Sequence, residues 1–559
     1  MKIFNFLKFA LLLNIICFSA CSGDASIDAD VESEGIKIDS ELAINGLYFL
    51  TEKGEKTITF STNDNWTLSI EDVSRSVSWC KPSAVSGGKG TATVTFAVEE
   101  NLSFDIRTVS VKIKSGINSK SFKISQKGAM KIPGNLIPGI QFREIISRLA
   151  NGMEKPGNTI EISEVVPDTI IERIVVKLNE STPPHGNYVI ISSDDSLRPV
   201  YAIWDNKGQI TIQTKANVLY MSNNASYMFY ALKKLAYCDL TKMNSLNVKY
   251  MQGLFKESGI SSLDLSGFNT SIVVNMQEMF SGCRNLTTLD VSGFETSNVR
   301  DMSMMFLNCE KLTALDISKF NTSNVDKMIS MFNGCKNLTT LDVSSFNTSN
   351  VTRMDQMFGE CESLTTLNVS NFNTSKVTKM DGMFGGCKNL TILNVDNFDT
   401  SNVMEMAGMF HSCESLTSLD LSGFNTSNVK NTSWMFNGCE NLTTLNVSSF
   451  NTSKVEEMIS MFSICIKLET LDLSNFNTSK VKDMSYMFYS CELLKSLDIT
   501  SFSFIKNPNV LYMLDNIGNN HNPVSIIVTE AGYNYLTKTT DNCCMNTSVK
   551  FVKLDGTVW

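Results

Sequence analysis

Hydrophobic and polar positions repeat along the second half of the chain with one fixed period, which is the distance from Cys283 to Cys309. The unit reads close to M-F-x-x-C-x-x-L-T-x-L-D-V-S-x-F-N-T-S-x-V-x-x-M. A period of roughly 20 to 50 residues is typical of proteins in which equivalent coils stack around one elongated core. Nine cysteines mark the period: Cys283, Cys309, Cys335, Cys361, Cys387, Cys413, Cys439, Cys465 and Cys491. Because these cysteines occupy equivalent positions in equivalent coils, we interpret them first as structural residues and not as a catalytic or metal-binding set.

The hydrophobic period changes within one unit. Residues 312–317 match L-x-x-L-x-L, which points the apolar side chains inward and Asp316 outward because side chains alternate along a strand. The preceding apolar positions follow the spacing of one helix face: Val299, Met302, Met305, Phe306 and Cys309. We therefore predict an α/β solenoid over residues 217–502, with one parallel strand and one helix in each coil.

The segments on either side of the array follow other patterns. Residues 36–128 contain short runs that alternate apolar and polar positions between turn residues, which predicts an all-β sandwich. Residues 129–216 are less regular, with a short helix predicted at 142–149, and we interpret them as the N-terminal cap of the array. Residues 503–559 leave the pattern and are predicted to form the C-terminal cap. Caps are expected because the end coils of a stack otherwise expose an apolar edge.

The beginning of the chain is predicted to be a targeting segment. Lys2 and Lys8 flank the start of an apolar stretch that is too short to span a bilayer. Phe18-Ser19-Ala20-Cys21 resembles a bacterial lipobox, although Phe18 replaces the usual leucine. The resemblance implies that residues 1–20 are a signal peptide and that Cys21 is lipidated, which anchors the chain to the outer membrane. An ordinary secretory signal is the alternative.

Residues 21–35 are acidic and are predicted to form a tether. They resemble the export signal that moves Bacteroidota-type lipoproteins to the outer leaflet, and a plain solvated linker is the alternative. Without residues 1–20, which hold two lysines and no acids, the chain has a net charge of 46 − 57 = −11. Nucleic-acid phosphates repel such a protein, so no nucleic acid is expected as a partner.

Composition also argues against catalysis. The chain has 3 histidines, scattered outside any recognisable motif, and no CxxC pair that would support zinc. No distinctive acid/base or nucleophile–base set stands out, so we expect neither an enzyme nor a cofactor. The repeat cysteines lie at the buried end of the apolar stripe, where cysteine behaves as a small hydrophobe. We predict free buried thiols, with occasional disulfides and a metal site as the less favoured alternatives.

The outward strand position forms the main candidate site. Neighbouring carboxylates in this predicted concave ladder are expected to raise one another's pKa, which a cation or a basic partner would relieve. Simple hydrogen bonding along the ladder is the alternative. The candidate ligand-binding residues are Asp264, Asp290, Asp316, Asp342, Asn368, Asn394, Asp420, Asn446, Asp472 and Asp498. Selectivity is expected where side chains deviate from the repeat, as at Trp434, Tyr486, His411 and Ile464.

Two segments of the chain resemble known families. Residues 346–351 and 424–429 are clean copies of Phe-Asn-Thr-Ser-Asn-Val, and the whole unit resembles the BspA-like leucine-rich repeats of bacterial surface lipoproteins. Further upstream, the landmarks Trp66, Trp79, Asn101, Arg107 and 126–128 (Gln-Lys-Gly) resemble a BACON domain. That resemblance implies glycan binding or a spacer role. Trp66 and Trp79 are candidates for stacking on sugars, with a place in the sandwich core as the alternative.

Taken together, the two resemblances imply a surface-anchored bacterial lipoprotein with an adhesin-like role. Its expected partner is a macromolecule, which can be a host protein, a glycan such as mucin, or another cell. A structural envelope scaffold or spacer without a specific ligand is the alternative.

Overall fold

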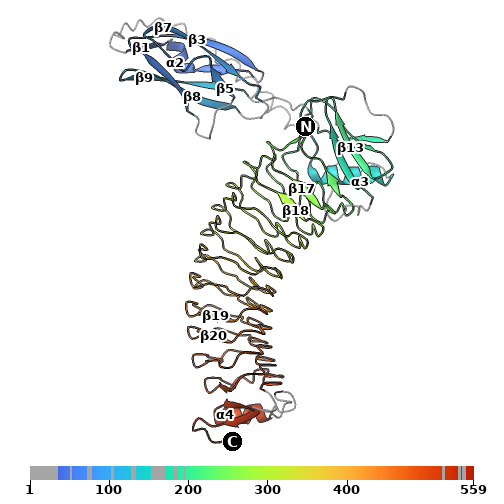
Figure 1. Cartoon of the computed structure of the whole chain (residues 1–559), viewed down its shortest axis with the longest axis vertical. Coiled ribbons are helices and arrows are strands. Elements are labelled where there is room, and N and C mark those ends of the chain that lie inside the picture. The colour runs from blue at the N-terminus through green and yellow to red at the C-terminus, as the bar shows by residue number, and fades with distance from the viewer. Residues whose placement is uncertain are drawn as a thin grey trace, which may run out of the picture. The chain divides into compact units, whose positions relative to one another are not determined.

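The computed structural model describes residues 35–38, 40–50, 53–71, 79–101, 106–127, 134–152, 170–180, 187–193, 196–518, 523–538, 543 and 549–559. The chain divides into two compact units, Met1–Met130 and Lys131–Trp559, which are described separately (Figure 1). The predicted signal peptide, the lipidation site Cys21 and nearly all of the tether lie outside the described residues. Within the described part of the chain, no helix is long and apolar enough to cross a membrane.

The first unit is built from two β-sheets that share one core. One sheet has the order β1-β3-β7-β5, from Ile36–Ile38, Gly54–Thr62, Gly90–Val98 and Cys80–Pro82. The other has the order β2-β9-β8-β4-β6, from Leu47–Phe49, Asn118–Gln126, Arg107–Ser115, Trp66–Glu71 and Ser86–Gly87. Helix α2 (Ser40–Asn45) joins β1 to β2. Side chains with a period of two, such as Phe60, Phe96 and Val111, fill the space between the sheets.

The second unit begins with a helix and a five-stranded sheet. Helix α3 (Gly139–Ala150) confirms the predicted helix, and its residues Phe142 and Ile146 are fully buried. The sheet has the order β11-β12-β13-β10-β15, from Tyr188–Ile190, Val200–Trp204, Gln209–Thr214, Arg173–Lys177 and Tyr237–Cys238. Phe142 lies edge-on to Phe229, with 5.9 Å between ring centroids. This contact covers the apolar beginning of the repeats.

The repeats form a stack of coils, seen as successive loops in Figure 1. One parallel β-bridge joins each coil to the next along residues 224–509. Just before this column begins, β14 (Leu219–Tyr220) pairs in parallel with β16 (Met243–Asn244). We call this continuous column the bridge ladder, and it consists of Asn224, Tyr250, Asn275, Asp301, Lys327, Arg353, Lys379, Glu405, Asn431, Glu457, Asp483 and Asn509. From Asn275 to Asn509, its steps reproduce the period of the sequence.

The predicted helix in each coil is wrong. Residues 217–502 are all described, and they contain no α-helix. In the coil around Met305, the N–H groups of Met304 and Phe306 donate to Ile329 and Met331 of the next coil, at 2.7 and 2.9 Å. The N–H groups between them close tight turns inside the coil. A helix would keep every one of these bonds within its own segment, so the hydrogen bonds between coils replace it.

Left-handed residues explain how the chain makes these turns. Met304 and Asn308 have φ angles of 58° and 56°, and equivalent pairs recur along the stack. Successive tight turns return side chains to the same side of the coil. Met302, Met305, Phe306 and Cys309 are therefore all fully buried, as the apolar pattern predicts, although the backbone is not helical.

The predicted parallel sheet forms only in part. Strand β17 (Ser262–Asp264) pairs with β18 (Thr288–Asp290), and β19 (Ser418–Asp420) pairs with β20 (Thr444–Asn446). Strand β21 (Ser496–Asp498) pairs with β22 (Val524–Ile527), which pairs with β23 (Val549–Val552). Among the other described coils, one further pairing occurs at the predicted strand positions, the parallel bridge between Thr366 and Ile392. Helix α4 (Glu530–Lys538) packs at the C-terminal end through Leu536.

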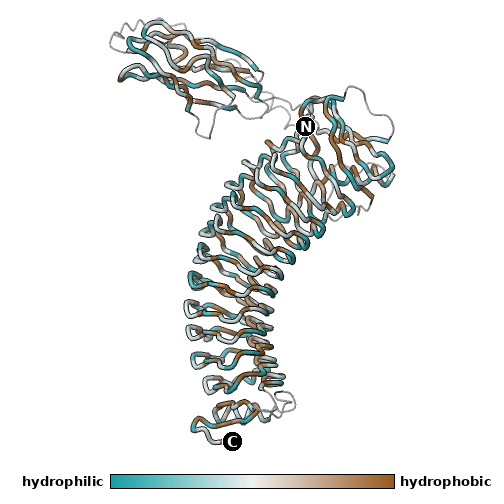
Figure 2. Tube along the Cα trace, in the orientation of Figure 1, coloured by the Kyte–Doolittle hydropathy of each residue, from teal (hydrophilic) through white to brown (hydrophobic). Residues whose placement is uncertain are grey.

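Columns of identical side chains fill the core of the stack. Phenylalanine rings lie one above another from Phe229 to Phe488, with centroids 4.9–6.0 Å apart and planes within 18° of parallel. Hydrophobic and hydrophilic stretches alternate along each coil in Figure 2. Each added coil thus buries the same apolar side chains against the coil before it.

A buried threonine also ties each coil to the next. Thr348 accepts a hydrogen bond from the N–H of Asn373 at 2.7 Å and donates one to the C=O of the same residue at 2.9 Å. The donated bond recurs at the equivalent Thr-Ser turns, most of which are preceded by Asn, from Thr270, Thr296, Thr322, Thr374, Thr400, Thr426, Thr452 and Thr478. These triplets act as turn residues.

Replacing this hydroxyl is expected to weaken the stack. Thr348→Val keeps the side-chain shape and leaves the N–H and C=O of Asn373 without their partner, which we expect to cost about 1–3 kcal/mol of unfolding free energy. Thr348→Ser is the matched control, because it keeps the hydroxyl and loses one methyl group. Urea denaturation followed by circular dichroism measures both. A valine variant as stable as the serine variant would contradict the role of this hydrogen-bond pair.

Candidate binding face

The outward ladder residues lie on one exposed surface of the coil stack, which we call the strand face. All of them are exposed, from Asp264 to Asp498. Where strands pair, the ladder is in register, with Asp264 opposite Asp290 and Asp420 opposite Asn446. The fold therefore brings together candidates that are one repeat apart in sequence.

Each ladder side chain makes the same local hydrogen bond. Its Oδ1 accepts a hydrogen bond from the backbone N–H two residues further on, at 2.8–3.1 Å. In some coils a hydroxyl adds a second bond, as Ser318 does to Asp316 at 2.7 Å. Aspartate and asparagine both supply this acceptor oxygen, which explains why both residue types occur at this position. This bond lies within the turn, and Asp420 has a further side-chain hydrogen bond with Asn446 along the ladder.

The expected rise in carboxyl pKa is wrong for five of these residues. Hydrogen bonds from the serine two positions on hold the carboxyl pKa below its usual value in Asp264, Asp316, Asp342, Asp420 and Asp472. The repulsion between coils is a lesser effect, as for the charge of Asp316 near Asp342. The local donors favour the charged form more than neighbouring carboxylates oppose it. These five carboxylates therefore stay ionised without a bound cation.

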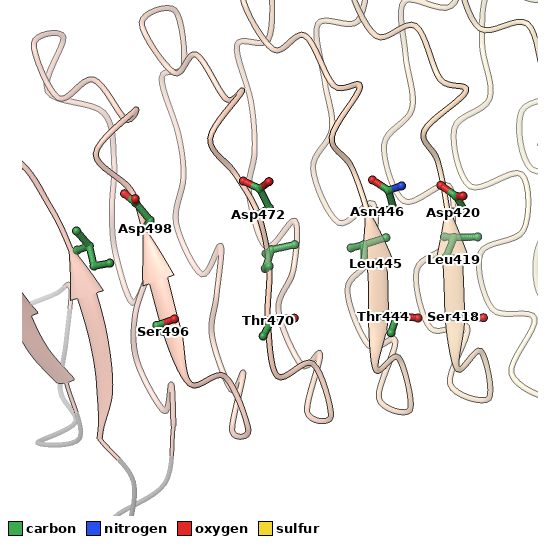
Figure 3. Close-up of a pocket in the computed structure, with 12 residues that line it drawn as sticks. Ser418, Leu419, Asp420, Thr444, Leu445, Asn446, Thr470, Asp472, Ser496 and Asp498 are labelled. Carbon is green, nitrogen blue, oxygen red and sulfur yellow. The ribbon is translucent and has the colours of Figure 1, made fainter. Parts of the chain in front are cut away.

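The strand face is hollowed where β19, β20 and β21 lie. This hollow has a volume of about 660 Å³ and is lined by three parallel rows (Figure 3). One row carries hydroxyls, from Ser418, Thr444, Thr470 and Ser496. The middle row is apolar, with Leu419, Leu445 and Leu471, and the third carries Asp420, Asn446, Asp472 and Asp498. A second hollow of about 500 Å³ repeats the arrangement over β17 and β18.

Sequence reasoning missed the hydroxyl row. Its signal is the serine or threonine that stands two positions before most of the ladder residues, because both positions point to the same side of a strand. Ala314 and Ile392 interrupt this row. In the two hollows, the surface offers hydroxyl donors and carboxylate or amide acceptors on either side of a row of mostly buried leucines. Chemically, it can hold an extended ligand that presents matching groups at a regular interval.

The cysteines form a second column, inside the core. Cys335 and its equivalents are at most 1% exposed and free of disulfides, which confirms the prediction of free buried thiols. The Cys335 thiol donates to the C=O of Phe306 at 3.2 Å, and burial raises its pKa to about 12. No group of three or more histidine, cysteine, aspartate or glutamate side chains among the described residues is arranged to hold a metal ion.

The two tryptophans of the first unit differ in their surroundings. Trp66 is 4% exposed and lies edge-on to Phe60, with centroids 4.9 Å apart, so its predicted stacking on a sugar is wrong. Trp79 is partly buried, and the guanidinium of Arg107 covers its ring at 4.3 Å. Arg107 also donates to Gln126 Oε1 at 2.9 Å. Because Arg107 covers one face of the Trp79 ring, we assign Trp79 a packing role.

The residues that deviate from the repeat also differ. His411 is half-buried over Gly385 and Gly408, and burial lowers its pKa. Ile464 is half-buried, whereas the Trp434 side chain is 46% exposed. Among these four deviating residues, Trp434 and Tyr486 are the large aromatic ones, and Tyr486 contacts a further ring at Tyr489, 5.8 Å away.

Comparison with known protein families identifies the repeats. A family model described as "Mycoplasma protein of unknown function, DUF285" matches residues 223–340, 287–367, 308–419, 363–444 and 417–526. These matches together span residues 223–526, which is more than half of the 559 residues. The chain belongs to the DUF285 family. The DUF285 repeats include the whole ladder from Asp264 to Asp498 and the bridge ladder from Asn224 to Asn509.

A second family model matches upstream of the DUF285 repeats. The BACON model, described as "Putative binding domain, N-terminal", matches residues 66–127 and confirms the resemblance seen in the sequence. No curated protein matches this chain. Among solved structures, the chain is similar to a Bacteroides ovatus GH5 xyloglucanase in complex with a XXXG heptasaccharide, at 20% identity and a TM-score of 0.15. That likeness covers 19% of this chain and 27% of the xyloglucanase chain.

The buried thiols are expected to be unreactive in the folded DUF285 repeats. A thiol must ionise to attack an alkylating reagent, and burial keeps Cys335 protonated far above neutral pH. Iodoacetamide at about pH 8 should leave the nine repeat cysteines unmodified, and the same reagent in denaturant should modify all of them. Peptide mass spectrometry gives the readout for each site. Modification of Cys335 in the native chain would refute the assignment.

The ladder carboxylates are expected to contribute a pH-dependent part of the stability. Because their folded pKa is lowered, this stabilisation is present above the unfolded value near 3.8 and is lost as the pH falls through the folded pKa. Changing Asp264, Asp316, Asp342, Asp420 and Asp472 together to Asn keeps every turn acceptor and removes this dependence. Thermal unfolding at a series of acidic pH values should show a smaller fall in Tm for the variant. An equal fall in both proteins would be the contrary result.

Proposed function

We propose that this chain is a lipoprotein anchored at the surface of the outer membrane, and that its strand face binds a macromolecular ligand in an adhesin-like role. The lipobox at Cys21 and the acidic tether support the anchor. The match to a BACON model described as a binding domain supports a recognition role. The ligand classes that fit are a host protein, a glycan such as mucin, or the surface of another cell.

The observation that carries the proposal is the three-row arrangement of the strand face. Turn hydrogen bonds hold each Asp or Asn in one orientation, so the face is organised before any ligand arrives. The hollow over β19–β21 is shallow and continuous with similar coils, which suits a chain-like ligand more than an enclosed small molecule. A stable interface buries about 1,200–2,000 Å² in total, and several consecutive coils are needed to supply that area.

Binding without catalysis is the role that this site chemistry supports. An acid/base pair requires two groups whose surroundings push their pKa values apart. Asp316, Asp342 and Asp420 instead share one kind of surrounding, with the carboxyl pKa lowered by the same hydrogen bonds. The repeat thiols are buried and protonated. We therefore propose that the chain is not an enzyme and needs no cofactor.

We further propose that the coil stack is a solenoid related to the BspA-like leucine-rich repeats. Support comes from the fixed repeat unit and from the parallel bridges between coils. In this chain, tight turns occupy the part of each coil where the resemblance implied a helix.

The binding proposal predicts that bulky cations on the strand face reduce ligand binding. Full-length protein is tested against immobilised mucin, extracellular-matrix proteins and whole bacterial cells. Thr444→Arg with Thr470→Arg fills the hydroxyl row, and we expect at least ~10-fold weaker saturable binding, equivalent to about 1.4 kcal/mol. Thr352→Arg with Met404→Arg, two exposed positions beside the bridge ladder, is the matched control. Biolayer interferometry gives the dissociation constants.

Two outcomes would overturn this proposal. Absence of saturable binding to every probe would favour an envelope scaffold or spacer. Equal binding by the two variant pairs would remove the strand face from the site. Location is tested separately by adding protease to intact cells, where a chain that is cleaved only after lysis would contradict surface exposure.

A further inference from the structure

A column of left-handed residues runs along the turn side of the coils. Its members all have φ angles between 50° and 61°: Tyr227, Gly253, Glu278, Met304, Ser330, Gln356, Gly382, Gly408, Trp434, Ser460, Tyr486 and Tyr512. We call this set the left-handed column. Glycine adopts this conformation freely, whereas a bulky side chain adopts it at a cost in free energy.

Three large aromatic residues occupy this column in the C-terminal half of the stack. Trp434, Tyr486 and Tyr512 have φ angles of 57°, 58° and 52°. The rings of Tyr486 and Tyr512 are 5.1 Å apart, and Tyr489 lies edge-on to Tyr486 at 5.8 Å. We call Trp434, Tyr486, Tyr489 and Tyr512 the aromatic edge.

Packing does not explain the tryptophan. Its side chain is 46% exposed, although exposure of large aromatic surface to water is unfavourable. The two coils before it have Gly382 and Gly408 at the same position, so the fold accepts glycine there without strain. A strained and exposed aromatic residue that the stack does not require points to a function outside the stack.

The spacing of the aromatic edge follows the coils. Stacked chain segments lie roughly 4.8 Å apart, so Trp434 and Tyr486, two coils apart, are separated by about 10 Å along the stack. Ser460 between them is 8% exposed and leaves no ring at that step. The adjacent Tyr486 and Tyr512 follow at a single step. Flat apolar faces are therefore offered at intervals of one or two coils.

Polar groups lie close in the chain to these rings. Along the bridge ladder, Asn431, three residues before Trp434, donates to Glu457 Oε2 at 3.1 Å, and Asn509, three residues before Tyr512, donates to Asp483 Oδ2 at 2.9 Å. The Asn516 side-chain amide donates to the hydroxyl of Tyr489 at 3.3 Å. These carboxylates and amides can accept from and donate to ligand hydroxyls. The carboxylates also disfavour a nucleic acid, whose bases would otherwise stack on such rings.

We propose that the aromatic edge is a second binding site, which takes an extended neutral polysaccharide along the axis of the stack. A pyranose ring has an apolar C–H face that packs on an aromatic ring and hydroxyls around its rim. An extended β-linked glycan advances by close to one coil spacing per sugar, so alternate or successive sugars meet Trp434, Tyr486 and Tyr512. This site is independent of the strand face and does not rest on the function proposed for that face.

Affinity electrophoresis of the full-length chain tests this site. The gels contain hydroxyethyl cellulose, xylan, mixed-linkage β-glucan or glucomannan, and at least one of them should retard the wild-type chain. Trp434→Gly with Tyr486→Gly, which restores the residue found at Gly382 and Gly408, is expected to reduce affinity at least tenfold. Trp434→Phe should retain most of the binding, because it keeps a stacking face.

The matched control removes an exposed ring elsewhere on the stack. Tyr250 is 39% exposed, and Tyr250→Asn introduces the residue that the bridge ladder has at Asn224 and Asn275. This variant should bind like the wild type, and circular dichroism checks that all variants keep the fold. Failure of all four polysaccharides to retard the wild-type chain, or equal retardation of the double glycine variant, would overturn the proposal. Neither result bears on ligand binding by Thr444 and Thr470 at the strand face.

Discussion

Backbone hydrogen bonds between consecutive coils are the constraint on which the rest of this structure depends. In each turn segment, N–H groups alternate between a partner in the same coil and a partner in the next coil, as for Met305 and Met304. A coil can satisfy these bonds only when it follows the path of its neighbour. Residues one period apart must then lie one above another, and the sequence repeats because every coil has the same neighbours above and below it.

The bonds between coils therefore produce columns of equivalent residues, and each column has its own structural role. Inside, the phenylalanine column stacks ring on ring, and the cysteine column fills the remaining space with thiols that donate to backbone carbonyls. At the turns, the threonine column joins backbone groups of successive coils. Outside, the Asp/Asn column holds the turn that follows each strand position. A column that serves the stack must stay uniform, whereas an exposed column is free to vary where a ligand requires it.

The two exposed surfaces proposed as sites use this freedom differently. The strand face repeats hydroxyl, leucine and Asp or Asn rows over the coils of its two hollows, and its binding potential comes from that repetition. The aromatic edge depends on side chains that vary within the left-handed column, since Trp434 follows Gly382 and Gly408 and Tyr486 follows Ser460. Repetition gives a long, low-specificity contact area, and exceptions at a few coils give selectivity within it. Both together suit a polymeric ligand.

The sequence by itself determined the period, the buried columns and the outward ladder. Each follows from alternation or spacing of apolar residues, which a stack of equivalent units must repeat. Only the tertiary structure decided the path of the backbone in each coil, because the spacing of Met302, Met305 and Phe306 fits a helix and a run of tight turns equally well. The bonds that choose between them reach residues of the next coil. The pKa of Asp316 and the covering of Trp79 by Arg107 were hidden for a related reason, since both depend on which donors the folded chain places nearby.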